Sequence, residues 1–250
     1  MTEEVEKLNS SKLGTKQYWD DFYAVEQKNF SDNSEDEGEV WFSDADAEDK
    51  VVKFLIDHTA SSAEYVSDEF PFLKDSTTVI DLGTGNGHLV FRVRSEAEFR
   101  AELVGIDYSE TSVQFANRIL QKKKECEEIE DPKNNVKFNH VDFLSTGYTH
   151  TGEAFDLVLD KGTLDAIALS GDSLCDGQTG VQLYPAVVRD NFVKHGGIIL
   201  ITSCNFTEDE LIKLMDIEGL EVWKTINYPV YEFGGMKGQS ISSVAFRRSR

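Results

Sequence analysis

Residues 79–88 read VIDLGTGNGH, and this stretch decides the fold. An apolar run leads into Gly83, Gly85 and Gly87 at alternate positions, and an apolar helical pattern follows. A strand that turns through glycines into a helix is typical of an open α/β sheet, whose ligands lie at the carboxyl ends of the strands. A dinucleotide site of the G-x-G-x-x-G type is disfavoured, because its third glycine would fall at His88. The stretch therefore predicts a ligand-binding turn, but not one for NAD.

The chain from residue 51 onward alternates short apolar runs with amphipathic segments, as an α/β sandwich does. Helices are indicated by the apolar spacing of residues 113–120 and by a capping box at 207–210. Only a loop with three glycines separates the last two predicted strands, which leaves no room for a crossover helix. We therefore expect a mostly parallel seven-stranded sheet, flanked by helices and ending in an antiparallel hairpin. The predicted strands are residues 78–82, 102–107, 136–139, 155–160, 197–203, 220–228 and 240–247.

Residues 1–50 are expected to form an acidic arm ahead of a domain at 51–250. Residues 31–49 hold nine acidic side chains and no Lys or Arg, so self-repulsion favours a mobile segment. Trp41 and Phe42 interrupt this run, and either a hydrophobic anchor or a lid over a ligand would account for them. Aromatic side chains at helical spacing in residues 18–23 predict a short amphipathic helix before it.

Composition excludes several classes of function. The chain has 250 residues, 40% of them hydrophobic, and a net charge of −21, which repels the phosphates of nucleic acids. Its three cysteines form no C-x-x-C motif and its five histidines show no metal-ligand spacing, so we expect no metal site and a reducing compartment. The apolar runs are too short to span a bilayer. We expect a cytoplasmic monomer with no membrane or nucleic-acid partner.

Four acidic residues follow the predicted strands, and parallel strands would bring them to one edge of the sheet. They are Asp81, Asp107, Asp142 and Asp160. Taken singly, an aspartate at a strand end is more often a turn former than a ligand. Together they offer acceptors for ribose hydroxyls, an adenine amine and an ammonium group, with no cluster of Lys or Arg for a pyrophosphate. Asp107 suits the ribose, and Phe143 offers an apolar face for adenine. The pattern predicts a nucleoside ligand without phosphates.

These features resemble the class I, seven-β-strand S-adenosylmethionine-dependent methyltransferases, with D-x-G-x-G-x-G standing at 81–87. The stretches at 13–19 (LGTKQYW), 38–42 (GEVWF) and 160–167 (DKGTLDAI) are similar to elongation factor 1-alpha lysine methyltransferases of the EFM4/METTL10 type. The resemblance implies a Rossmann-like fold, S-adenosylmethionine as cofactor and a basic protein substrate, elongation factor 1-alpha, in the cytoplasm. The expected cofactor-binding residues are Trp41, Asp81, Gly83, Thr84, Gly85, Gly87, Asp107, Tyr108, Asp142, Phe143 and Asp160.

Methyl transfer to an amine is an in-line displacement, so alignment and a dry setting matter more than a covalent nucleophile. A free lysine has a pKa of about 10.4 and must lose its proton before it attacks. We expect Asp160, Thr163, Asp165 and Tyr231 to form the substrate channel, and Phe233 to be a second candidate for its wall. For Thr163 and Asp165, capping of the next helix fits equally well, and for Phe233 core packing is favoured. A small-molecule methyltransferase and a non-catalytic cofactor-binding module remain alternatives.

Overall fold

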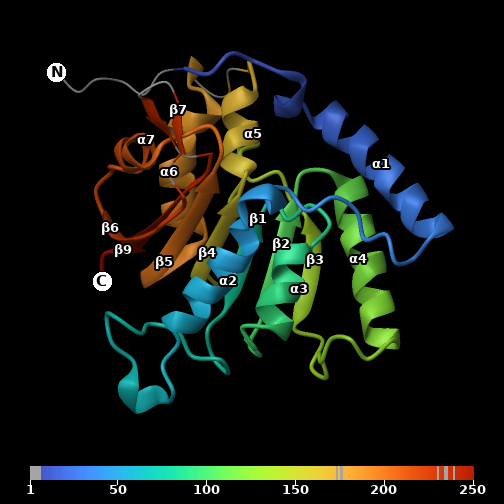
Figure 1. Ribbon diagram of the computed structural model, residues 1–250. Coiled ribbons are helices and arrows are strands. Elements are labelled where there is room, and N and C mark those ends of the chain that lie inside the picture. The colour runs from blue at the N-terminus through green and yellow to red at the C-terminus, as the bar shows by residue number, and fades with distance from the viewer. Residues whose placement is uncertain (1–6, 173, 175–176, 230, 234–235, 239) are drawn as a thin grey trace.

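The computed structural model describes residues 7–172, 174, 177–229, 231–233, 236–238 and 240–250, and it contains a seven-stranded sheet (Figure 1). The strand order is β3-β2-β1-β4-β5-β9-β6. The seven predicted strands are confirmed, although β5 begins earlier than expected, at Val193. Their bounds are β1 (Val79–Leu82), β2 (Leu103–Asp107), β3 (Val136–His140), β4 (Phe155–Lys161), β5 (Val193–Ser203), β6 (Leu220–Ile226) and β9 (Ser242–Arg248).

The end of the sheet is antiparallel, as predicted. Strands β1 to β5 pair in parallel, whereas β9 pairs antiparallel with both β5 and β6 and so lies between them. The connection from β6 to β9 was expected to be only a loop. It contains a small antiparallel pair, β7 (Tyr231–Phe233) and β8 (Met236–Gly238).

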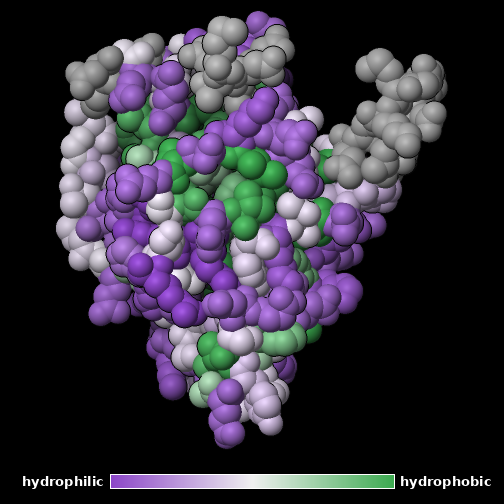
Figure 2. Space-filling model, turned by 90° about the vertical axis from the view of Figure 1, so that its left-hand side faces the viewer, coloured by the Kyte–Doolittle hydropathy of each residue, from purple (hydrophilic) through white to green (hydrophobic). Residues whose placement is uncertain are grey.

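Helices cover both faces of the sheet because β1 alternates its side chains between two buried clusters. Val79 packs with α2 (Ala47–Asp57), α3 (His88–Ser95) and α4 (Glu110–Glu125). Ile80 and Leu82 pack with α5 (Thr163–Leu169), α6 (Gly180–Asn191) and α7 (Glu208–Leu214). The predicted capping box opens α7 at Thr207. Among the described residues, none of the helices has the length and apolarity that a bilayer crossing requires. Seen from the β6 side, the surface is largely hydrophilic around one hydrophobic hollow (Figure 2).

The acidic arm is held against the domain. Its helix α1 (Lys16–Asp32) is longer than predicted and packs on α4 (Figure 1). The loop after α1 leads through the short 3-10 helix η2 (Ser43–Ala45) into α2, so residue 50 lies inside a helix. The expected boundary between an arm at 1–50 and a domain at 51–250 stays a prediction. Lysines near the end of α4 bind the acidic loop: Lys122 Nζ lies 2.6 Å from Glu35 and Lys123 Nζ lies 2.8 Å from Glu37. The acidic side chains of the arm repel one another, but these lysines of α4 offset that repulsion and hold the segment that was expected to be mobile.

The contacts of Lys122 and Lys123 with the acidic loop predict what would detach this loop from α4. The double variant Lys122→Glu and Lys123→Glu reverses both charges. A glutamate-specific protease should cleave residues 33–39 of this variant about ten times faster than in the wild type. The reason is that two ion pairs, each worth up to ~1 kcal/mol, become repulsive. Added salt should accelerate cleavage of the wild type, since it screens the same pairs. The exposed Lys133→Glu is the control and should cleave like the wild type. Equal rates for all three proteins would contradict this account of the arm.

Candidate active site

The candidate site lies at the carboxyl edge of the sheet, between β1 and β4. The chain winds from β1 through β2 to β3 on one side, and from β4 to β5 on the other. Ligands of open α/β sheets bind where the winding reverses in this way. The register aligns Leu82 with Asp160, which brings the ends of the two central strands together. Asp81, Asp107 and Asp160 are buried at this edge, and Asp142 is exposed.

The glycine turn after β1 needs its glycines for two reasons. Gly83, Gly85 and Gly87 have φ angles of 65°, 59° and 81°, a left-handed backbone that disfavours side chains. In addition, a Cβ at Gly85 would collide with the Tyr23 hydroxyl, and one at Gly83 would collide with Thr163. A ligand bound at this turn would also require the space that a Cβ would fill. At Gly83 and Gly85, however, side chains of the protein itself, Thr163 and Tyr23, already occupy that space.

Asp107 joins the end of β2 to the glycine turn. Its Oδ2 accepts a hydrogen bond of 3.0 Å from the Gly85 N–H, and its Oδ1 accepts one of 2.9 Å from the Ser109 N–H. The Ser112 hydroxyl donates to the Gly85 carbonyl at 2.7 Å, and the buried Thr84 packs beside Gly105. Burial raises the pKa of Asp107, although these donors oppose the shift.

Asp160 caps the first turn of α5. Its carboxylate accepts hydrogen bonds from the Thr163 N–H at 2.9 Å, the Leu164 N–H at 3.1 Å and the Tyr184 hydroxyl at 2.6 Å. Burial raises the pKa of Asp160 to about 7. Burial likewise raises the pKa of Asp81 to about 7, with the charge of Lys161 opposing the shift.

The other predicted channel residues fasten neighbouring segments. The Thr163 hydroxyl donates to the Leu82 carbonyl at 2.6 Å. Asp165 is buried, and it accepts hydrogen bonds from the Ser203 hydroxyl at 2.5 Å and from the N–H groups of Cys204 and Asn205 at 3.0 and 3.1 Å. Thr163 therefore ties α5 to β1, and Asp165 ties it to the loop after β5. The capping role that the sequence analysis left open for both residues belongs to Asp160.

Three further predicted residues lie near the ends of β2 and β3. Tyr108 is half-buried, and burial raises its pKa. Asp142 accepts a hydrogen bond of 3.2 Å from the Leu144 N–H. Phe143 is buried in the core, where its ring centroid lies 5.7 Å from that of Phe192. Tyr231 and Phe233 lie on β7, but their side chains are outside the described part of the chain. Within that part, no group of three or more side chains could hold a metal ion.

Aromatic side chains of the arm gather over the glycine turn. The Trp19 ring centroid lies 5.4 Å from that of Trp41 and 6.1 Å from that of Tyr23, whose hydroxyl borders Gly85. The Trp19 indole donates to the Leu13 carbonyl at 2.8 Å, which fixes the start of the arm. Trp41 is therefore anchored, since it packs on Trp19 and Phe22 of α1, and its role as a lid over a ligand stays a prediction.

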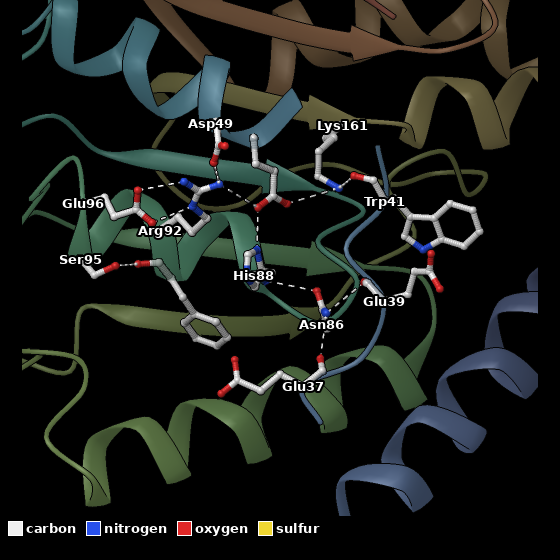
Figure 3. A network of polar contacts seen from close by, with 12 residues as sticks. Glu37, Glu39, Trp41, Asp49, Asn86, His88, Arg92, Ser95, Glu96 and Lys161 are labelled. Carbon is white, nitrogen blue, oxygen red and sulfur yellow. Dashed lines mark hydrogen bonds and ion pairs between the residues drawn. The ribbon is translucent and has the colours of Figure 1, made fainter. Parts of the chain in front are cut away.

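A polar network that includes Asn86, His88 and Lys161 connects the arm to the glycine turn (Figure 3). Sequence reasoning missed Glu48, which lies between His88 and Lys161. Its side chain is 4% exposed and lies 2.6 Å from His88 Nδ1 and 3.5 Å from Lys161 Nζ. Asn86 adds a second link, because its side-chain amide donates to the Glu37 carbonyl at 2.9 Å. Glu48 falls among other acids in the sequence, and only its helical spacing to the buried apolar residues of α2 could have marked it.

The raised pKa of Asp160 predicts a pH-dependent stability. Between pH ~4 and ~7, Asp160 keeps a proton in the folded protein that it has lost in the unfolded chain. The free energy of unfolding should therefore fall as pH rises through this window, by up to about 1.4 kcal/mol per pH unit, and should level off above pH ~7. Asp160→Asn does not titrate. The stability of the wild type relative to this variant, measured by urea denaturation, should therefore decrease across that window. A difference that does not vary with pH would contradict the assignment.

Solved structures share the fold at low sequence identity. The [4+2]-cyclase SpnF matches with a TM-score of 0.62 at 13% identity, covering 99% of this chain and 99% of that chain. Magnesium protoporphyrin IX methyltransferase from Synechocystis, solved with bound SAM, matches with a TM-score of 0.50 at 16% identity, covering 91% of this chain and 97% of that chain. These likenesses support the predicted sheet and its flanking helices.

Sequence relatives are closer. Residues 73–235 match a family described as a methyltransferase domain. Protein-lysine N-methyltransferase EFM4 of Saccharomyces cerevisiae is 46% identical over 239 residues, covering 96% of each chain. Human EEF1A lysine methyltransferase 2 is 31% identical, covering 95% of this chain and 87% of the human protein. The chain therefore belongs to the class I methyltransferase family of EFM4 and EEF1A lysine methyltransferase 2.

Proposed function

We propose that this chain transfers a methyl group from S-adenosylmethionine to a lysine side chain of elongation factor 1-alpha. The observation that carries the proposal is the buried Asp107, held at the glycine turn where the winding of the sheet reverses. The name of the EFM4 relative indicates a protein lysine as the acceptor, and the name of EEF1A lysine methyltransferase 2 supplies elongation factor 1-alpha as the substrate.

The residues at the sheet edge suit this cofactor. Asp107 and Asp142 would accept hydrogen bonds from the ribose and the adenine, and Asp81 and Asp160 would accept them from the ammonium group. The floor of the site would be formed by Gly83, Thr84, Gly85, Gly87, Tyr108 and Phe143. The indole nitrogen of Trp41 is buried with no hydrogen-bond partner among the described residues, so a donor is available there for a polar ligand. When bound, S-adenosylmethionine supplies a methyl group on a positively charged sulfur.

The chain's own residues supply alignment and a dry setting. The arm's aromatic side chains exclude water from the edge where the amine must attack, and a desolvated lysine more readily loses its proton. Asp160, Thr163 and Asp165 contribute by fixing α5 and the loop after β5 beside this edge. A channel wall from Tyr231 remains part of the proposal.

A basic protein partner suits the charge of the molecule. The net charge of −21 attracts a positively charged surface and accelerates encounter at low salt. Elongation factor 1-alpha acts in translation, so we place the enzyme in the cytoplasm, and we propose that it works as a monomer. Methylation of a small molecule, or cofactor binding without catalysis, would be the competing functions.

Cofactor binding gives one prediction. Asp107→Ala should weaken binding of S-adenosylhomocysteine by about 1.5–3 kcal/mol, the usual contribution of a hydrogen bond to a charged group. Isothermal titration calorimetry measures the affinity, and a melting curve shows whether the loss of the Gly85 and Ser109 contacts unfolds the variant. Asp190→Ala, on the exposed side of α6, is the control and should bind like the wild type. Equal affinity of Asp107→Ala and the wild type would remove Asp107 from the site.

Substrate methylation gives another prediction. The recombinant protein with labelled S-adenosylmethionine should label elongation factor 1-alpha, and replacing the target lysine by arginine should end the labelling. Raised salt should increase KM more than it lowers kcat, because the Debye length falls from ~10 Å at 0.1 M to ~3 Å at 1 M. Preferential labelling of small metabolites in cell extract would favour the small-molecule alternative, and no labelling at all would favour the non-catalytic one.

A further inference from the structure

Glu48 is a buried carboxylate with cationic or titratable partners from two different parts of the site. His88 begins α3 directly after the glycine turn, and Lys161 ends β4 next to Asp160. Arg92 is a weaker partner at 3.9 Å, because it pairs closely with Asp49 at 2.7 Å and also binds Glu96. Burial alone would raise the pKa of Glu48, but the His88 hydrogen bond and the charges of Lys161 and Arg92 lower it below its ordinary value. Glu48 is therefore an anion at neutral pH.

Lys161 depends on Glu48. Its side chain is only 13% exposed, and Glu48 is its carboxylate partner among the described residues. Its ammonium donates to the Trp41 carbonyl at 3.2 Å and lies 5.6 Å from the centroid of the Phe42 ring. An ammonium that is largely shielded from water and loses its counterion turns toward solvent. This movement would weaken the contact of Lys161 with Trp41, which Figure 3 shows, and also its contact with Phe42.

The segment that Lys161 holds is under backbone strain. Phe42 and Asp46, on either side of η2, have φ angles of 67° and 53°, in the left-handed region that non-glycine residues rarely adopt. The Phe42 ring also lies where a Cβ at Gly162 would come within 3.1 Å of it. Such strain persists only where surrounding contacts hold it. Here Phe42 is held by Lys161 and by the apolar cluster of Ala47, Tyr228 and Ile241, while the neighbouring Trp41 packs on the aromatic side chains of α1.

We infer that Glu48 is a positioning residue for methyl transfer, which acts through Lys161 to hold Trp41 and Phe42 against the site. This inference rests on the proposed function, because it assumes that the cofactor lies under this segment. Glu48 does not touch the substrate in this account. It fixes the cover that retains the cofactor, so its loss should affect cofactor binding more than the chemical step.

The test compares Glu48→Gln, Lys161→Met and the double variant, with kcat and KM for S-adenosylmethionine and calorimetric binding of S-adenosylhomocysteine. Each single variant should raise KM about tenfold and change kcat less than about threefold. If Glu48 acts through Lys161, the double variant should also lose about tenfold, whereas independent effects would multiply to about a hundredfold. Lys161→Arg keeps the cation and should stay near the wild type. Glu96→Gln removes an exposed partner of the same Arg92 and is the matched control.

The outcomes separate this inference from the proposed function. Melting curves establish that each variant is folded at the assay temperature. If the wild type binds the cofactor and the Glu48→Gln and Lys161→Met variants bind it equally well, the inference is overturned and the proposed function is not. Multiplied losses in the double variant, or a fall in kcat without a change in KM, would also overturn it. A wild type with no affinity for S-adenosylhomocysteine would overturn the proposed function together with the inference.

Discussion

Burial of carboxylates at one edge of the sheet is the constraint on which the rest of this structure depends. Asp107 and Asp160 are each compensated by backbone N–H groups, and these come from the turn after β1 and from the first turn of α5. The N–H donors therefore belong to the two segments that border the candidate site, namely the glycine turn and the start of α5. A backbone that satisfies buried acids in this way is fixed before any ligand arrives, which is what precise alignment of two reacting molecules requires.

The segments that resemble the lysine methyltransferases have a common physical role in docking the arm. A Cβ at Gly14 would collide with the backbone of Leu169, where the arm crosses the end of α5. Thr15 caps α1, and Trp19 returns to the Leu13 carbonyl. The second segment supplies Trp41 and Phe42, and the third supplies Lys161, which contacts both. Residues far apart in the chain thus form a single contact region.

Local pattern predicted the sheet well because each strand is an apolar run bounded by turn residues. The aspartates at the strand ends could be placed for the same reason, since parallel strands bring their carboxyl ends to one edge. The partners of those side chains could not be predicted. Asp165 binds the loop after β5, about 40 residues further along the chain, and Glu48 lies beside Lys161, about 110 residues away. No local sequence pattern encodes contacts between segments so far apart.

The position of β9 between β5 and β6 has a consequence for synthesis of the chain on the ribosome. Within the described part of the chain, β6 pairs in the sheet with β9 alone, and β5 pairs with β4 and β9. Because β9 (Ser242–Arg248) follows β5 and β6 in the chain, it is made after them, and until it emerges β5 has an open edge and β6 has no place in the sheet. Unpaired edges of this kind promote aggregation. A nascent chain stalled before β9 would therefore be a substrate for chaperones, although its whole candidate site has already been translated.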